Sequence, residues 1–102
     1  MNFFRAQQKG IAFEQMKDYN SADGGDGHTE GLCVSDSPEP HSFGGAWDAM
    51  NEDDEIVILK GRILTEIYDG YRIQPISEIA RFTVAEWTRM LETGEAYDYE
   101  EW

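Results

Sequence analysis

The hydrophobic pattern is strongest in the second half of the chain, where it predicts paired strands. Ile56-Val57-Ile58-Leu59 is a run of four aliphatic residues, as in a central strand buried on both faces. Gly61 is expected to break or bulge this run, and a second strand is expected over 63–68. Asp69-Gly70 is the sequence signal of a two-residue hairpin.

Three further strands are predicted around this hairpin. A return strand is expected over 71–74, ended by Pro75, and a further short strand over 76–82. Upstream, residues 31–35 are expected to form a short strand that buries Leu32, Cys33 and Val34. These segments together predict a mostly antiparallel sheet of three or four strands within residues 31–82.

Helical patterns follow the outer strands. A short helix is expected over 41–50, burying Phe43, Trp47 and Met50. Thr83 and Glu86 form a capping-box pattern that opens a helix over 84–93, and Gly94 is suited to the left-handed cap at its end.

The N-terminal segment allows two interpretations. Residues 2–19 fit one helix interrupted at Gly10, or a strand over 2–7 followed by a helix over 12–19. Residues 20–30 are rich in Gly and Asp and are expected to form a loop. The whole pattern predicts a single α+β domain over 1–102, with two or three helices packed on the sheet.

Charge is the most distinctive property of the composition. The 102 residues include 21 Asp and Glu against 8 Lys and Arg, a formal net charge of −13. Binding to a phosphate backbone depends on Lys and Arg, so we expect no direct binding to nucleic acid and none to anionic membranes. A basic partner, in contrast, would be attracted over a distance.

Cysteine usage and the N-terminus favour a cytoplasmic, bacterial setting. Cys33 is the sole cysteine, so an internal disulfide is excluded. The sequence shows neither a signal-peptide pattern nor an apolar stretch of membrane-spanning length.

The polar residues do not match the spacing of common metal or nucleophile sites. His28, Cys33 and His41 lack the paired spacing of zinc ligands, and Asp23, Asp26 and Glu30 do not keep the alternation of a calcium loop. Cys33 lies between apolar residues, which indicates a core position for it. We therefore expect no metal and no cofactor.

Two short segments carry a partial resemblance to a known enzyme class. Phe4-Arg5 resembles the aromatic-Arg pair in the first strand of small mono-ADP-ribosyltransferase-like proteins of phages and plasmids, and residues 31–39 resemble their Gly-hydrophobic-x-hydrophobic-Ser segment. This resemblance implies binding of NAD, with Arg5 on the dinucleotide, Ser35 supporting the pocket and Glu55 as the catalytic acid.

Two acidic clusters point instead to a binding protein. One comprises Glu52, Asp53, Asp54 and Glu55, and the other comprises Glu92, Glu95, Tyr97, Asp98, Tyr99, Glu100, Glu101 and Trp102. The tail over 95–102 is either disordered or packs its aromatics and presents its carboxylates outward. Carboxylates on a rigid fold imitate a phosphate track and suit a groove lined by Lys and Arg, while Tyr and Trp are common interface anchors.

In size and charge the chain is similar to the phage-encoded anti-CRISPR and DNA-mimic proteins. The expected function is therefore that of a non-enzymatic inhibitor of a basic protein or protein–RNA complex, with a CRISPR effector as the favoured partner. The alternative is the NAD-binding, ADP-ribosyltransferase-like protein, active or degenerate.

Overall fold

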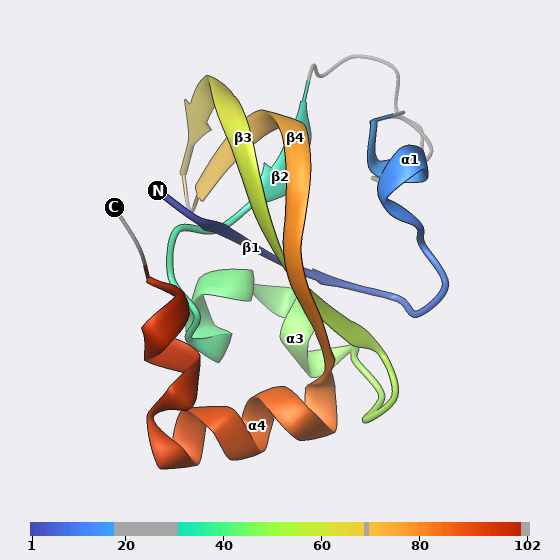
Figure 1. Cartoon of the computed structure of the whole chain (residues 1–102), viewed down its shortest axis with the longest axis vertical. Coiled ribbons are helices and arrows are strands. Elements are labelled where there is room, and N and C mark those ends of the chain that lie inside the picture. The colour runs from blue at the N-terminus through green and yellow to red at the C-terminus, as the bar shows by residue number, and fades with distance from the viewer. Residues whose placement is uncertain (18–30, 69, 101–102) are drawn as a thin grey trace.

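Four antiparallel strands form one sheet, and the helical elements that follow the second and fourth strands cover one end of it (Figure 1). The computed structural model describes residues 1–17, 31–68 and 70–100. The strands are β1 (Phe3–Gln7), β2 (Leu32–Val34), β3 (Glu55–Ile67) and β4 (Gly70–Thr83), in the order β1-β3-β4-β2. This arrangement confirms the predicted α+β class.

The helical elements are short except for the one that follows β4. They are α1 (Phe13–Met16), the 3-10 helix η1 (Pro40–Phe43), α3 (Gly45–Asp48), α4 (Val84–Thr93) and the 3-10 helix η2 (Glu95–Tyr99). Across the described ranges, no helix combines the length and the apolar character needed to cross a membrane.

The central hairpin is longer than the sequence pattern indicated. Ile67 pairs with Gly70, which confirms the hairpin but not the position of its connection, because Gly70 belongs to β4 and the two positions between the paired residues are 68 and 69 rather than 69 and 70. Asp69 lies outside the described residues. Gly61 lies at a bulge, which confirms one of the two outcomes expected for it, whereas the strand end expected at Pro75 is wrong, because β4 runs through as one strand. Gly61 pairs with Pro75 next to a register shift, so the missing proline N–H is accommodated at a bulge.

The N-terminal segment forms a strand, which confirms the second of the two interpretations for its first part. β1 pairs with β3 from Phe3 opposite Leu59 to Gln7 opposite Glu55. The sheet therefore extends beyond the predicted limits of 31–82. The helix expected over 12–19 is observed as the four-residue α1, and residues 18–30 lie outside the described part.

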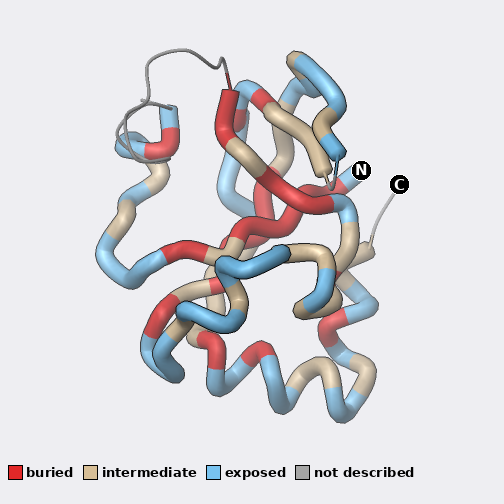
Figure 2. Tube along the Cα trace, turned by 180° about the vertical axis from the view of Figure 1, so that it is seen from behind, coloured by how far each residue is buried: buried red, intermediate tan, exposed pale blue. Residues whose placement is uncertain are grey.

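A second contact of β1 curls the sheet toward a barrel. Phe4 and Ser35, the residue after β2, exchange two backbone hydrogen bonds, each 2.8 Å from N to O. Since β2 also pairs with β4, each strand has a neighbour on both sides along part of its length. This closure explains why β1 is deeply buried although it is short (Figure 2).

Alternating residues of β1 and β3 supply two separate cores. The core inside the curled sheet contains Phe3, Met16, Leu32, Val34, Val57, Leu59 and Ile73. The core between the sheet and the helices contains Phe4, Ile56, Ile58, Val84, Trp87 and Ala96. The aliphatic run over 56–59 thus points to both cores in turn, which confirms that it is buried on both faces.

The ends of α4 follow the sequence signals. The Thr83 hydroxyl accepts a hydrogen bond from the Glu86 amide at 3.1 Å, and the Glu86 carboxylate accepts one from the Thr83 amide at 2.9 Å. Gly94 closes the helix with a φ of 89°. The helix expected over 41–50 is instead divided into η1 and α3, because Gly44 has a φ of 58° that interrupts helical geometry.

Close packing at the bulge makes Gly61 sensitive to substitution. A Cβ at this position would lie 2.6 Å from Ile73 Cδ1 and 2.7 Å from the Gln74 carbonyl oxygen. We expect Gly61→Ala to lower the free energy of unfolding by about 1–3 kcal/mol. Urea denaturation followed by tryptophan fluorescence measures this loss.

Gly45→Ala is the matched control, because a Cβ at Gly45 would meet no atom within 4 Å and the residue begins α3. We expect this change to be neutral or to stabilise by up to about 1 kcal/mol. Equal denaturation midpoints for the two variants would contradict the tight packing at the bulge.

Candidate acidic interface

The first predicted acidic cluster divides into two residues that serve the fold and two that face solvent. Asp54 is 6% exposed, and its carboxylate accepts hydrogen bonds from the backbone N–H groups of Lys9 at 3.0 Å and Asn51 at 2.8 Å. Glu55 forms an ion pair with Arg81 at 2.8 Å. Glu52 and Asp53 are exposed, and Asp53 contacts the Lys9 ammonium group. Neutralising the whole cluster would therefore remove contacts that hold the loop.

The same loop meets the beginning of α4 through its backbone. The carbonyl oxygens of Glu52 and Asp54 accept hydrogen bonds from Ala85 N–H at 3.1 Å and Val84 N–H at 2.8 Å. These contacts satisfy two of the amide groups that every helix leaves free at its first turn. The backbone of Glu52 is thus placed beside the N-terminal end of α4.

The second cluster extends from the other end of α4. Glu92, Glu95 and Asp98 are exposed and Glu100 is partly exposed. In the described part of the chain, none of these four carboxylates forms an ion pair with a lysine or an arginine. Between Val84 and Glu100 the sequence has five acidic residues and one base, Arg89. We use the name α4 acidic surface for Glu52, Asp53, Glu86, Glu92, Glu95, Asp98 and Glu100.

The tail is ordered as far as the structure describes it, by its buried residues. Ala96 is fully buried, and the Tyr99 ring makes an edge contact with Phe82 at 5.5 Å between centroids and a tilted contact with Trp87 at 6.2 Å. For Tyr99 this agrees with the second of the two expected states, in which aromatics pack and carboxylates remain outside. Glu101 and Trp102 lie outside the described residues.

The two tyrosines of the tail have different environments. Tyr99 is engaged with the core, whereas Tyr97 is 41% exposed and its hydroxyl donates to the Glu39 carboxylate at 3.2 Å. Burial and the nearby Glu39 raise the pKa of Tyr97. Glu39, on the loop before η1, adds a carboxylate beside the α4 acidic surface. The sequence analysis missed it, because its approach to Tyr97 arises from tertiary packing alone.

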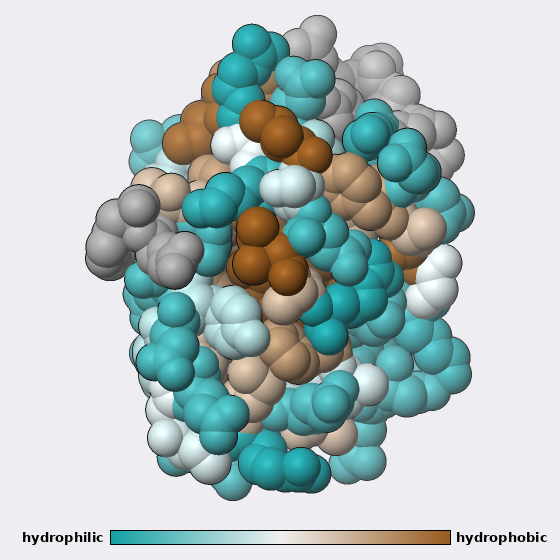
Figure 3. All heavy atoms as spheres, in the orientation of Figure 1, coloured by the Kyte–Doolittle hydropathy of each residue, from teal (hydrophilic) through white to brown (hydrophobic). Residues whose placement is uncertain are grey.

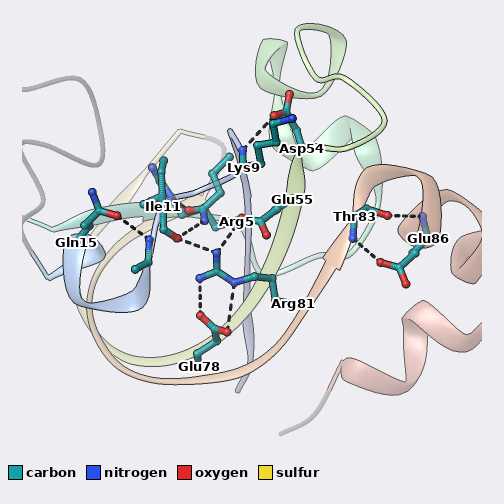
Figure 4. Close-up of polar contacts among 12 residues, drawn as sticks. Arg5, Lys9, Ile11, Gln15, Asp54, Glu55, Glu78, Arg81, Thr83 and Glu86 are labelled. Atoms are coloured by element: carbon teal, nitrogen blue, oxygen red, sulfur yellow. Dashed lines mark hydrogen bonds and ion pairs between the residues drawn. The ribbon is translucent and has the colours of Figure 1, made fainter.

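The open end of the hairpin, where β3 begins and β4 ends, carries internally compensated charge (Figure 4). Arg81 contacts Glu78 and Glu55 and donates to the Ile11 carbonyl at 2.8 Å, and the hydrogen bond that it donates to the Glu78 carboxylate raises the pKa of Arg81. The hydrogen bond donated by the Thr83 backbone lowers the pKa of Glu86. The contact between Lys9 and Asp53 raises the pKa of the ammonium group and lowers that of the carboxyl.

The three residues implied by the transferase resemblance lie in separate contacts. Arg5 is 8% exposed and donates to Gln7 Oε1 at 3.1 Å and to the Cys33 carbonyl at 2.8 Å. The Ser35 hydroxyl is bonded to the backbone of Ser37. Glu55 lines a shallow depression together with Phe13, Glu78 and Arg81, and neither Arg5 nor Ser35 lines it.

The described residues show no metal-binding geometry. Within residues 1–17, 31–68 and 70–100, no group of three His, Cys, Asp or Glu side chains is arranged to hold a metal ion. His28, Asp23, Asp26 and Glu30 lie outside these ranges, and Cys33 is partly exposed rather than buried as its neighbours are.

The buried contacts of Arg5 predict a structural role. Arg5→Ala leaves the Cys33 carbonyl and the Gln7 side chain without this donor, and we expect a loss of about 2–4 kcal/mol in the free energy of unfolding. Arg62→Ala is the control, because Arg62 is exposed and its change should stay within about 0.5 kcal/mol. Thermal denaturation of both variants tests this, and an Arg5→Ala variant as stable as the parent chain would contradict it.

Comparison of the chain with protein-family models, with curated protein sequences and with solved structures finds no match.

Proposed function

We propose that this chain is a non-enzymatic binding protein whose α4 acidic surface occupies the nucleic-acid groove of a basic partner. The observation that carries the proposal is the concentration of exposed carboxylates on Glu92, Glu95 and Asp98, outside any ion pair in the described residues. They sit on backbone that buried neighbours hold in place. An arrangement of this kind presents negative charge at fixed positions.

Fixed carboxylates are suited to a groove that normally holds phosphates. Arg binds carboxylate and phosphate in similar bidentate geometry, so a carboxylate on a rigid support competes for the same donors. Attraction between the net charge of −13 and a basic groove accelerates the encounter of the two molecules. The favoured partner is a protein–RNA complex that binds DNA, of which a CRISPR effector is the first to test.

The placement of the candidate catalytic residues favours this function over NAD-dependent chemistry. Arg5 is buried with internal acceptors, and the Ser35 hydroxyl is used by the turn that follows β2. Both side chains thus have roles within the fold. We therefore place the partner contacts on the carboxylates and propose no catalytic residue.

A displacement assay tests the function directly. Labelled target DNA is bound to each of a panel of basic DNA-binding complexes, including RNA-guided effectors, and the chain is added in increasing amounts. We expect release of DNA from one complex at near-stoichiometric amounts, and a steep loss of this effect as salt is raised. Absence of displacement from every complex would overturn the proposal.

Charge-neutralising variants test whether the α4 acidic surface is responsible. Glu92→Gln/Asp98→Asn removes two exposed carboxylates, and we expect the rate of association with the partner to fall about tenfold at low salt. Stopped-flow or surface-based kinetics measures this rate.

The matched control is Glu14→Gln/Glu66→Gln, which removes the same charge from exposed positions on α1 and β3, at the end of the molecule away from α4 (Figure 1). Equal effects of the two double variants would show that only net charge matters, and would contradict a defined surface.

A further inference from the structure

A pocket of about 250 Å³ lies where the N-terminal residues, the middle of β4 and η2 meet. Its lining comprises Asn2, Ile79, Met90, Glu95, Asp98 and Tyr99. Pockets for drug-sized ligands are larger, about 300–1,000 Å³, so this one is suited to a single side chain. Figure 3 shows apolar side chains at the centre of this face of the molecule, surrounded by hydrophilic ones.

One wall of the pocket holds an unsatisfied acceptor. Asn2 is 3% exposed, and its Nδ2 donates to the Tyr99 carbonyl at 2.8 Å, which fixes the orientation of the amide. Among the described residues, Asn2 Oδ1 has no hydrogen-bond partner. A buried acceptor without a donor is unfavourable, so a ligand that brings an N–H to this oxygen gains from it.

The rest of the lining selects the chemistry of that donor. Glu95 and Asp98 are exposed carboxylates that favour a cation. Ile79 is 44% exposed, and together with Met90 and the Tyr99 ring it offers apolar surface for the stem of a long side chain. The pocket thus combines two charges, one neutral acceptor and an apolar wall.

We propose that this pocket receives an arginine side chain of the partner protein. A guanidinium group has five N–H donors in one plane, a number that suits a pocket lined by several acceptors, and it stacks on aromatic faces. A lysine ammonium is a compact point charge and matches this set of acceptors less well. The inference rests on the proposed function, because the arginine belongs to the basic partner that the α4 acidic surface binds.

The experiment uses the whole chain and a small probe. Arginine amide is titrated into the protein while NMR follows the Asn2 side-chain amide and the Ile79 methyl groups. We expect both signals to shift, with a dissociation constant on the order of 1–10 mM, as is usual for so small a ligand. Citrulline amide has nearly the same shape without the charge and should shift them at least tenfold more weakly.

Two double variants complete the test. Glu95→Gln/Asp98→Asn should weaken arginine amide binding at least tenfold, since both carboxylates line the pocket, whereas Glu14→Gln/Glu66→Gln should leave it unchanged. Absent shifts, equal shifts with citrulline amide, or full affinity in the first variant would overturn the inference.

The outcome is separable from that of the displacement assay. Displacement of DNA without arginine binding would overturn the pocket inference alone. Arginine binding without displacement from any complex would overturn the proposed function and leave the pocket as a guanidinium site.

Discussion

The two hydrogen bonds between Phe4 and Ser35 are the constraint on which the rest of the structure depends. They give β1 a second neighbour and bury both of its faces, so that Phe3 enters one core and Phe4 the other. Phe4 contacts Trp87, whose indole N–H donates to the Pro38 carbonyl at 2.9 Å. Through this chain of contacts the closure of the sheet positions α4, and α4 in turn positions the acidic surface.

The distribution of charge follows from how the few bases are used. Lys9, Lys17 and Arg81 are paired with carboxylates of the loops, α1 and the hairpin, and Arg5 is buried against backbone and amide acceptors. Arg89 is the one base that the sequence supplies between Val84 and Glu100. Glu92, Glu95 and Asp98 lie where α4 passes into η2, exposed and outside any ion pair with a lysine or arginine of the described residues, and the proposed contacts are placed there for that reason.

Sequence motifs correctly predicted the parts of the fold that depend on residues close together in the chain. The Thr83–Glu86 box, the left-handed Gly94 and the aliphatic run over 56–59 all have the expected roles. The sequence pattern wrongly predicted that Pro75 ends its strand. Pairing between β3 and β4 continues past this residue, because its missing N–H falls at a bulge opposite Gly61. The pattern was also ambiguous over β1, because a short strand with both faces buried has no alternation that separates it from a helix.

The candidate site was only partly predictable for a similar reason. The run of acidic residues from Glu52 to Glu55 is visible in the sequence as a cluster. The sequence around it does not show that Glu52 is exposed and Asp54 is buried. The pocket beside η2 joins residues from both ends of the described chain, since Asn2 and Tyr99 are 97 positions apart. The surface contribution of Glu39 depends likewise on a contact with Tyr97 that only the folded chain creates.

The separation between residues that support α4 and residues that face outward from it has an evolutionary consequence. Trp87, Ala96 and Tyr99 hold the backbone, while Glu92, Glu95 and Asp98 project from it without supporting it. Exposed positions of this kind tolerate substitution with little loss of stability. Natural selection is thus free to change the carboxylates one at a time, and the specificity of this surface can diverge among descendants that keep the same fold.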